Sequence, residues 1–509
     1  MLFFNINNAI FNTLTPHKIF QAIVIVLFLL MFFVYIFFGK FFMTSETHKI
    51  PLSKAKLLAY ALISSVTFAL CVMPQLPGIS IPVFTTIQFI CLFFILPNKK
   101  RLLWFIPIGI LSLNYFIYAN TIWHISNFIV ILFLYACMLT NFNLKDTSMS
   151  FFKNILNVLK PFKYIHLPLK WTAHIAGGKA PVIKRTIIAL FIALPFTLVL
   201  TFILTSADMV FSAQIGNFFT SLMKNIKFNT IYIIICGKIA GLYLFGMIYS
   251  SFKPADSKIS CDFKLKVDPI IINILLVSIL FVYSFFVIIQ FKYLFAGSTL
   301  PYGLTYTEYA RKGFFELFFL TGINITLILL TVKISNTFSE KCKQFTKILS
   351  CYLCFVTIIL LISSFYRMHL YTSDDGLTRL RFLVMGFLIF EGIGLLITLL
   401  YIIKPKFNII SVYLIIALSY YCILNITPMD TIIAKNQISK YESGKQDSIS
   451  YVLTLSPDAA PVIYEFSLNN PDYAINSYFT KIETDYSKIP HRWQRYNISI
   501  EKALKLTSQ

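Results

Sequence analysis

The sequence predicts an all-α protein: a bundle of about twelve transmembrane helices with a small helical tail outside the membrane at its C-terminus. Of its 509 residues, 57% are hydrophobic and only 13% are charged, which is too little polar surface for a soluble globule of this size. The apolar stretches are long and repeated, whereas an apolar run of about 10 to 14 residues is more typical of a soluble core. We therefore expect a lipid bilayer to surround most of the chain.

Each expected span is a run of about 20 mostly apolar residues, the length that crosses the hydrocarbon core of a bilayer as a helix. The first run is too long for the core of a signal peptide and is expected to remain as a helix. Twelve such runs occur, near residues 19–39, 57–73, 79–97, 102–119, 122–140, 186–205, 230–250, 269–290, 313–332, 347–366, 382–403 and 408–426.

The loops between these runs alternate in charge. Every odd-numbered loop is basic, whereas the even-numbered loops either contain no Lys or Arg or mix both signs. Because cytoplasmic loops carry an excess of Lys and Arg, the alternation predicts that the odd loops are cytoplasmic and that both termini are extracytoplasmic. Anionic lipids of the inner leaflet are the expected partners of the basic loops.

The formal net charge of +23 does not indicate nucleic-acid binding, in spite of the usual link between a basic balance and phosphate recognition. From Asp430 onward, nine Lys or Arg face nine Asp or Glu, so the whole excess lies in residues 1–429. There it clusters in short loops between apolar runs. The sequence therefore predicts membrane topology and no nucleic-acid partner.

The chain divides into three expected regions. Residues 1–183 form an N-terminal membrane region of about five spans and an amphipathic basic loop at 141–185. Residues 184–429 form a second membrane region of about seven spans, and residues 430–509 form the extramembrane helical tail.

Two further segments alternate polar and apolar residues at helical spacing. Residues 151–163 predict an amphipathic helix, which either lies on the inner leaflet or caps the bundle. Residues 204–223 predict a short helix on the outer surface.

Lys238 and Glu391 lie inside two expected spans, each about nine residues from the outer end. An ionisable group in the bilayer interior costs about 2.5 to 3.5 kcal/mol on insertion scales, so it needs a partner or a function. Both helices are expected to run inward, which places the two charges at the same depth. We therefore expect a buried ion pair, which either fixes helix packing alone or forms part of a proton or cation route.

A second group of charges is expected as a cluster on the outer face. Arg379 and Arg381 precede an apolar helix, where a cation opposes the helix dipole. We expect acidic partners to hold them, such as Glu308, Asp374 or Asp375. A neutralised internal network and an anion site both fit this composition. The members of the cluster are Asp208, Glu308, Arg311, Glu316, Arg367, Asp374, Asp375, Arg379 and Arg381.

Three segments carry a resemblance to a known family: YTEYARKGFFEL (306–317), FYRMHLYTSDDGLTRLRF (365–382) and LSPDAAPVIYEF (455–466). They resemble the signature segments of a bacterial polytopic membrane family catalogued as domain of unknown function 4173, over most of the chain from about Lys184 to the end. Family members usually have an aromatic residue before Gly-Leu-Thr, where this chain has Asp375. The resemblance implies a bacterial plasma-membrane protein without an established activity, whose recurrent pattern includes Glu308, Arg311, Glu316, Arg367, Arg379 and Arg381.

Nucleotide, metal and hydrolase motifs are absent from the sequence. The segment AHIAGGKAP lacks the spacing of a phosphate-binding loop, and neither H-E-x-x-H nor Gly-x-Ser-x-Gly occurs. We therefore expect no cofactor and no bound metal, and no residue is assigned a catalytic role.

Three functions remain open. The favoured one is a non-catalytic sensor, scaffold or assembly partner that acts through the external tail and the outer charged loops. A secondary transporter would use the midplane charges of Lys238 and Glu391. A membrane-embedded transferase for a lipid-linked substrate would use outer acids as acid/base or metal-binding groups, with Asp208, Glu308, Asp374 and Asp375 as the candidates.

Overall fold

The structure is a computed structural model, and it describes residues 53–73, 77–139, 160–175, 228–252, 268–290, 314–335, 337–405, 407–470, 473–486 and 493–507, with the single positions 193, 197 and 214. All secondary structure in these residues is helical. The predicted all-α class is therefore confirmed for the described part of the chain. The expected spans near 19–39 and 186–205 and the expected helix at 204–223 lie outside the described residues, apart from those single positions.

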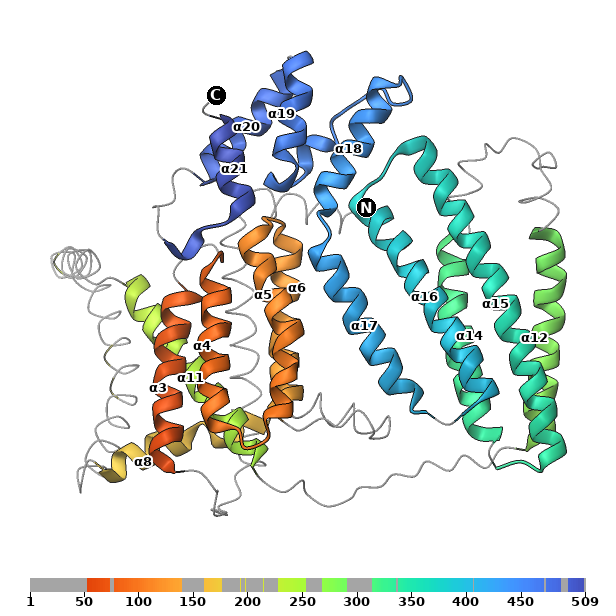
Figure 1. The fold of residues 1–509 in the computed structure, drawn as a ribbon, viewed down its shortest axis with the longest axis horizontal. Coiled ribbons are helices and arrows are strands. Elements are labelled where there is room, and N and C mark those ends of the chain that lie inside the picture. The colour runs from red at the N-terminus through yellow and green to blue at the C-terminus, as the bar shows by residue number, and fades with distance from the viewer. Residues whose placement is uncertain are drawn as a thin grey trace.

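Five of the helices that the structure describes form the first bundle (Figure 1): α3 (Lys54–Cys71), α4 (Ser80–Ile95), α5 (Phe105–Ile117), α6 (Thr121–Leu139) and α11 (Phe228–Ser251). Helices α3 and α11 pack closely because α11 presents glycines to α3. A Cβ atom on Gly237 would lie 2.6 Å from the Cβ atom of Ala69, and one on Gly241 would overlap the side chain of Ser65. Small residues at such positions let helix backbones approach each other in a membrane, where packing drives association.

A 3-10 helix, η2 (Lys160–Tyr164), and helix α8 (His166–Ile175) cover one end of this bundle. Phe162 is buried, with its ring centroid 5.1 Å from that of Tyr243 on α11. A Cβ atom on Gly246 would overlap the backbone of Pro161. The structure describes only the last four residues, 160–163, of the predicted amphipathic segment 151–163. At these residues the chain caps the bundle.

The second bundle contains α12 (Pro269–Gln290), α14 (Phe314–Ser335), α15 (Glu340–Asp375) and α16 (Arg379–Ile403). Helix α17 (Ile409–Ile426) lies between the two bundles and contacts α5 on one side and α16 on the other (Figure 1). It is therefore the helix that joins the two bundles.

Helix α15 extends well beyond the span expected at 347–366. Its 36 residues correspond to about 54 Å of helix, against about 30 Å for the hydrocarbon core of a bilayer. The charged segment after Tyr366, which the sequence predicts as an outer loop, is thus mostly helix. The helix ends at Gly376, whose φ of +74° is a conformation that glycine adopts without steric cost.

Eight helical segments in the described residues are long and apolar enough to cross a membrane: α3, the continuous run of η1 (Lys99–Trp104) and α5, α6, α11, α12, α15, α16 and α17. Two shorter apolar helices, Ser80–Ile95 and Phe319–Ser335, add to these. Ten of the twelve predicted ranges thus coincide with apolar helices in this part of the chain. The predicted count of twelve spans is not confirmed.

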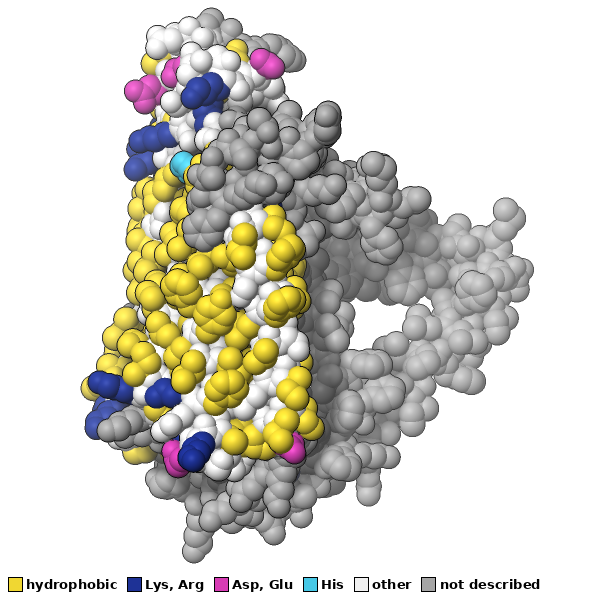
Figure 2. All heavy atoms as spheres, turned by 90° about the vertical axis from the view of Figure 1, so that its right-hand side faces the viewer, with side chains coloured by type: hydrophobic (Ala, Val, Ile, Leu, Met, Phe, Trp, Pro, Cys, Tyr) yellow, Lys and Arg dark blue, Asp and Glu magenta, His cyan; other side chains and the backbone are white. Residues whose placement is uncertain are grey.

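The surfaces of these helices carry many apolar side chains. On α12, Ile270, Phe281 and Phe285 are each more than 60% exposed. Figure 2 shows hydrophobic side chains covering this face of the second bundle, with charged side chains gathered above and below them. An exposed apolar surface of this extent favours a lipid environment.

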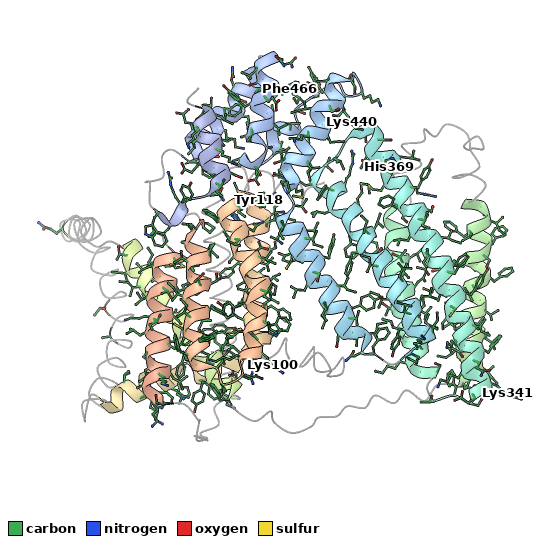
Figure 3. All side chains as sticks on the ribbon, in the orientation of Figure 1. Lys100, Tyr118, Lys341, His369, Lys440 and Phe466 are labelled. Carbon is green, nitrogen blue, oxygen red and sulfur yellow. The ribbon has the colours of Figure 1, made fainter. Side chains whose placement is uncertain are left out.

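The C-terminal residues form helices α18 (Met429–Glu442), α19 (Ala460–Asn469), α20 (Tyr473–Tyr486) and α21 (Ile498–Thr507), with short 3-10 turns between them. They share a core of their own, in which Ile433, Val452, Ile463 and Ala503 are fully buried. This unit lies across one end of the two bundles (Figure 1). Lys100 and Lys341, in two of the basic loops, lie at the opposite end (Figure 3).

Candidate functional site

Asp430 is the most deeply buried acid in the part of the chain that the structure describes, with only 1% of its surface exposed. It lies in the first turn of α18, directly after the short turn that follows α17. An acidic residue in a first turn complements the partial positive charge of a helix N-terminus. That position accounts for an acid in the sequence, but the depth of burial requires specific partners.

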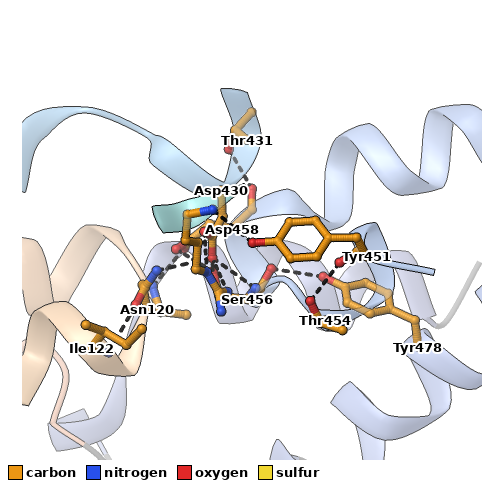
Figure 4. Close-up of polar contacts among 11 residues, drawn as sticks. Asn120, Ile122, Asp430, Thr431, Tyr451, Thr454, Ser456, Asp458 and Tyr478 are labelled. Carbon is orange, nitrogen blue, oxygen red and sulfur yellow. Dashed lines mark hydrogen bonds and ion pairs between the residues drawn. The ribbon is translucent and has the colours of Figure 1, made fainter. Parts of the chain in front are cut away.

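Five donor groups meet the carboxylate of Asp430 (Figure 4). Arg379 donates from Nε to Oδ1 at 2.8 Å and from Nη2 to Oδ2 at 2.6 Å. Asn120 donates from Nδ2 to Oδ2 at 3.2 Å. Ser456 donates to Oδ2 from its backbone nitrogen at 3.0 Å and from its hydroxyl at 2.6 Å. Burial alone would raise the pKa of this carboxyl, but the bonds and charge of Arg379 and the bonds of Ser456 outweigh it and hold the pKa below its ordinary value.

A second buried acid, Asp458, lies on the other side of Ser456. Its Oδ1 accepts the backbone N–H of Ala119 at 2.7 Å, and its Oδ2 lies 2.8 Å from the hydroxyl oxygen of Ser456. A serine hydroxyl has one proton, so it donates to only one of two neighbouring carboxyl groups. Burial raises the pKa of Asp458 to about 6, whereas the pKa of Asp430 is held below its ordinary value. Asp458 is therefore the first of the two acids to take up a proton as pH falls.

These residues come from separate parts of the fold. Asn120 lies in the turn between α5 and α6, Arg379 begins α16, and Asp430 lies in the first turn of α18. Ser456 precedes the 3-10 turn η5 (Pro457–Ala459), and Asp458 lies within it. We refer to these five residues as the junction. It joins the C-terminal helices to the first bundle through Asn120 and to the second bundle through Arg379.

The turn between α15 and α16 adds further bonds to α18. Gln437 donates to the carbonyl of Leu377 at 2.7 Å, and Asn436 accepts the backbone N–H of Leu377 at 2.9 Å. Lys440 donates to the carbonyl of Thr372 at 2.7 Å. A Cβ atom on Gly376 would lie 2.6 Å from Nε2 of Gln437, so the turn fits against the helix without spare room.

The structure divides the predicted outer charged cluster. Arg379 binds Asp430, which is not among its expected partners, and the side chains of Glu308 and Asp374 lie outside the described set. Arg381 pairs with Asp375 at 3.2 Å, donates to the carbonyl of Gly376 at 2.6 Å and stacks over the ring of Tyr371. Among the described side chains, Arg381 therefore pairs with an expected acid, whereas Arg379 pairs with Asp430.

The other predicted members of this cluster are placed only in part. Arg367 is buried on α15. Glu316 and Asp374 belong to α14 and α15, but their side chains are outside the described set. Asp208, Glu308 and Arg311 lie outside the described residues altogether.

The predicted ion pair between Lys238 and Glu391 is not formed. Lys238 is exposed on α11 in the first bundle, whereas Glu391 is buried on α16 in the second, where it accepts a hydrogen bond from Thr321 at 2.7 Å. Position along a helix sets the depth of a residue but not its lateral neighbours. Equal depth was therefore insufficient evidence for contact.

Sequence reasoning missed four of the five junction residues: Asn120, Asp430, Ser456 and Asp458. Asp430 reads as an ordinary acid at a helix start, and Asn120 as a turn residue between two spans. Ser456 and Asp458 lie within LSPDAAPVIYEF (455–466), a segment that carries the family resemblance but assigns no role to either residue. The remaining signal was that the two acids, Asp430 and Asp458, have largely apolar neighbours in the sequence. Ala459 and Ala460, for example, follow Asp458 directly.

A cavity of about 200 Å³ opens beside the junction. Arg379, Ser456 and Tyr478 line it from the junction side, and Lys481 and Asp485 line it from α20. Tyr478 is tied to the junction because its hydroxyl donates to the carbonyl of Ser456 at 2.9 Å. In the described ranges, no group of three His, Cys, Asp or Glu side chains could hold a metal ion.

A family model described as "Domain of unknown function (DUF4153)" matches residues 105–466 of the chain. No curated protein and no solved structure matches the chain. The sequence predicted a different family, domain of unknown function 4173, and that prediction is wrong. Its coarser part, that the chain belongs to a family of unknown function, is confirmed. Because the match covers well over half of the chain, this protein belongs to the DUF4153 family.

Proposed function

We propose that this protein is a multi-pass bacterial plasma-membrane protein with a non-catalytic role, as a sensor, scaffold or assembly partner. Its C-terminal helices lie on the extracytoplasmic side, where the junction holds them against both helix bundles. The alternating loop charges support this orientation, because Lys100 and Lys341 lie at the end of the bundles opposite the C-terminal helices (Figure 3).

The closed geometry of the junction is the observation that carries the proposal. A carboxylate offers about four lone-pair sites, and five donor groups already meet Asp430. Four of these donors meet Oδ2, and Nε of Arg379 meets Oδ1, on a side chain with no exposed surface. A substrate, a metal ion or a transferred proton would therefore have to displace these donors to reach the carboxylate. An ionised acid held in this way stabilises a docked arrangement, whereas a general base must be within reach of the proton that it removes.

The arrangement also suits a scaffold because it places the C-terminal helices at a defined position. The junction contacts both bundles, and the Gly376 turn adds contacts to the second one. Relative movement of the two bundles would therefore strain the junction. A protein partner on the C-terminal helices would be held in a fixed position relative to the membrane.

Replacement of the chromosomal gene by variants tests this proposal. Asp430→Asn opens the junction, whereas Asp374→Asn with Asp375→Asn removes two of the four acids that a transferase would use. Glu442→Gln is a control at an exposed position of α18. We expect Asp430→Asn alone to reproduce the fitness profile of the gene deletion across growth conditions. If the Asp374 and Asp375 double variant reproduces that profile at normal protein level, the non-catalytic role is refuted.

Secondary transport is the second candidate function, and one observation favours it. Glu391 is buried within α16, and among the residues that the structure describes its carboxylate has Thr321 as its hydrogen-bond partner and no paired cation. Buried ionisable residues in membrane helices often mark ion or proton routes. The exposed Lys238 takes no part in this version of the proposal.

A line of buried polar residues extends along the same bundle, between α14 and α15. Asn324 donates to Thr357 at 3.1 Å and Thr331 lies 3.4 Å from Ser350, all of them at most 2% exposed. Such residues also serve as hydrogen-bonded contacts between membrane helices. Glu391→Gln in the same chromosomal assay separates the two readings: transport predicts a deletion-like profile, and the scaffold predicts a normal one.

A further inference from the structure

A long groove runs along the surface of the first bundle. One wall is the face of α4 from Pro82 to Phe93, and the other is the face of η1 and α5 from Leu102 to Leu113. Lys99 lies at one end, and the volume of the groove is about 630 Å³. It is thus an elongated channel between two antiparallel helices, with a basic residue at one mouth.

The length of the groove corresponds to one leaflet of a bilayer. Eleven residue steps separate the ends of each wall, which is about 16 Å of helix at 1.5 Å per residue. Half of the hydrocarbon core of a bilayer is about 15 Å. A chain that follows the groove from its basic mouth would therefore end near the middle of the membrane.

The lining of the groove suits a hydrocarbon chain. Phe89, Phe93 and Leu103 present apolar surface to it. A Cβ atom on Gly109 would meet no atom within 4 Å, so the glycine leaves open space in the floor. The hydroxyl of Ser112 donates to the carbonyl of Gly109 at 2.9 Å, so it requires no partner from an occupant.

The mouth of the groove carries positive charge. Lys99, Lys100 and Arg101 follow one another at the start of η1. The Lys99 ammonium donates to the carbonyl of Phe93 and lies 4.3 Å from the centroid of the Phe93 ring, which holds it at the end of the groove. An ammonium has three donors, so two remain for a second partner. Lys100 is exposed beside it.

We propose that this groove binds one acyl chain of an anionic phospholipid, whose phosphate group contacts Lys99 and Lys100. The length of the groove, its apolar lining and the charge at its mouth all favour the same occupant. This is a lipid of the leaflet that contacts the basic loops. The inference rests on the membrane placement proposed above, and it specifies one site among the basic loops.

Native mass spectrometry of the full chain tests the site, after equilibration in detergent with equal amounts of phosphatidylglycerol and phosphatidylcholine. We expect the protein to retain one phosphatidylglycerol in preference to phosphatidylcholine. Lys99→Gln with Lys100→Gln should lower this preference about 30-fold, since each cation near an anionic lipid surface contributes about 1 kcal/mol and each 1.4 kcal/mol is a factor of ten. The matched control, Lys341→Gln with Lys404→Gln, removes two exposed lysines at the same end of the second bundle and should leave the preference unchanged.

Filling the groove tests the chain-binding part separately. Gly109→Leu places a side chain in the open floor, and Leu103→Trp, at an exposed wall position, does the same without a change at the glycine. Both should lower retention of either lipid at least several-fold. Unchanged retention in both variants, or an unchanged preference in the lysine double variant, overturns the proposal. Release of the protein itself from carbonate-washed membranes would instead contradict the membrane placement.

Discussion

Replacement of Asp430 by asparagine measures how strongly the junction holds the C-terminal helices. The variant leaves the Arg379 guanidinium without its counter-ion and replaces one of the two accepting oxygens by an amide donor. Breaking a buried ion pair by removing one partner costs about 3 to 5 kcal/mol. The side chain of Arg379 is 26% exposed, so water recovers part of this cost. We therefore expect a loss of about 3 kcal/mol, which corresponds to about a 100-fold rise in the opening equilibrium.

Hydrogen exchange of the full chain in lipid nanodiscs gives the readout, because exchange of buried amides reports local opening. Peptides from α18 and α19 should exchange about 100-fold faster in Asp430→Asn, while peptides from α3 and α11 should not change. Glu442→Gln is the control, with an expected change below twofold. The combined change of Asp430→Leu and Arg379→Met should restore much of the protection, because no unpaired charge remains. An acceleration below about fivefold in Asp430→Asn would refute the role assigned to the junction.

Three further predictions concern single groups. Burial raises the pKa of Asp458 from 3.8 to about 6, so ionisation of this group opposes the folded state as pH rises through this range. The free energy of opening that amide protection of α18 reports should therefore fall by up to about 3 kcal/mol between pH 4 and pH 7. Asp458→Asn, which mimics the protonated acid, should remove that dependence, whereas the depressed pKa of Asp430 affects stability only at lower pH. Gly376→Ala should lower the thermal midpoint in detergent more than Gly444→Ala, because both glycines have positive φ but only Gly376 faces a close neighbour, Gln437. Gly237→Ala should also lower the midpoint, since its Cβ would lie 2.6 Å from that of Ala69, while Gly109→Ala should not.

The apolar helices could be predicted because their signal is local. A run of about 20 apolar residues identifies a span without knowledge of its neighbours, and ten predicted ranges coincide with helices in the described residues. The helical continuation of α15 to Asp375 was missed for the same reason, since the segment after Tyr366 is polar and lacks that signal. The backbone carbonyls of Thr372 and Ser373 in this continuation accept hydrogen bonds from Lys440 of α18.

The junction could not be predicted because its contacts join distant parts of the chain. Arg379 and Asp430 are 51 residues apart, and Ala119 and Asp458 are 339 apart. One sequence without a known fold provides no lateral neighbours. Lys238 and Glu391 show the opposite error, since their matched depth indicated a contact that the placement of their helices in different bundles prevents.

A charge in an apolar span is visible in the sequence, whereas a charge that the C-terminal helices bury is not. A carboxylate enclosed by protein loses water as a carboxylate in lipid does, at an effective cost of several kcal/mol. Asp430 and Asp458 bear that cost outside the spans, where a polar tail gives no sequence signal of burial. All five junction residues fall within the matched region 105–466, whereas α20 and α21 lie beyond it. The family model therefore ends after the segment that closes the junction, which makes the docked contact, rather than the whole C-terminal unit, the feature to test in other members of the family.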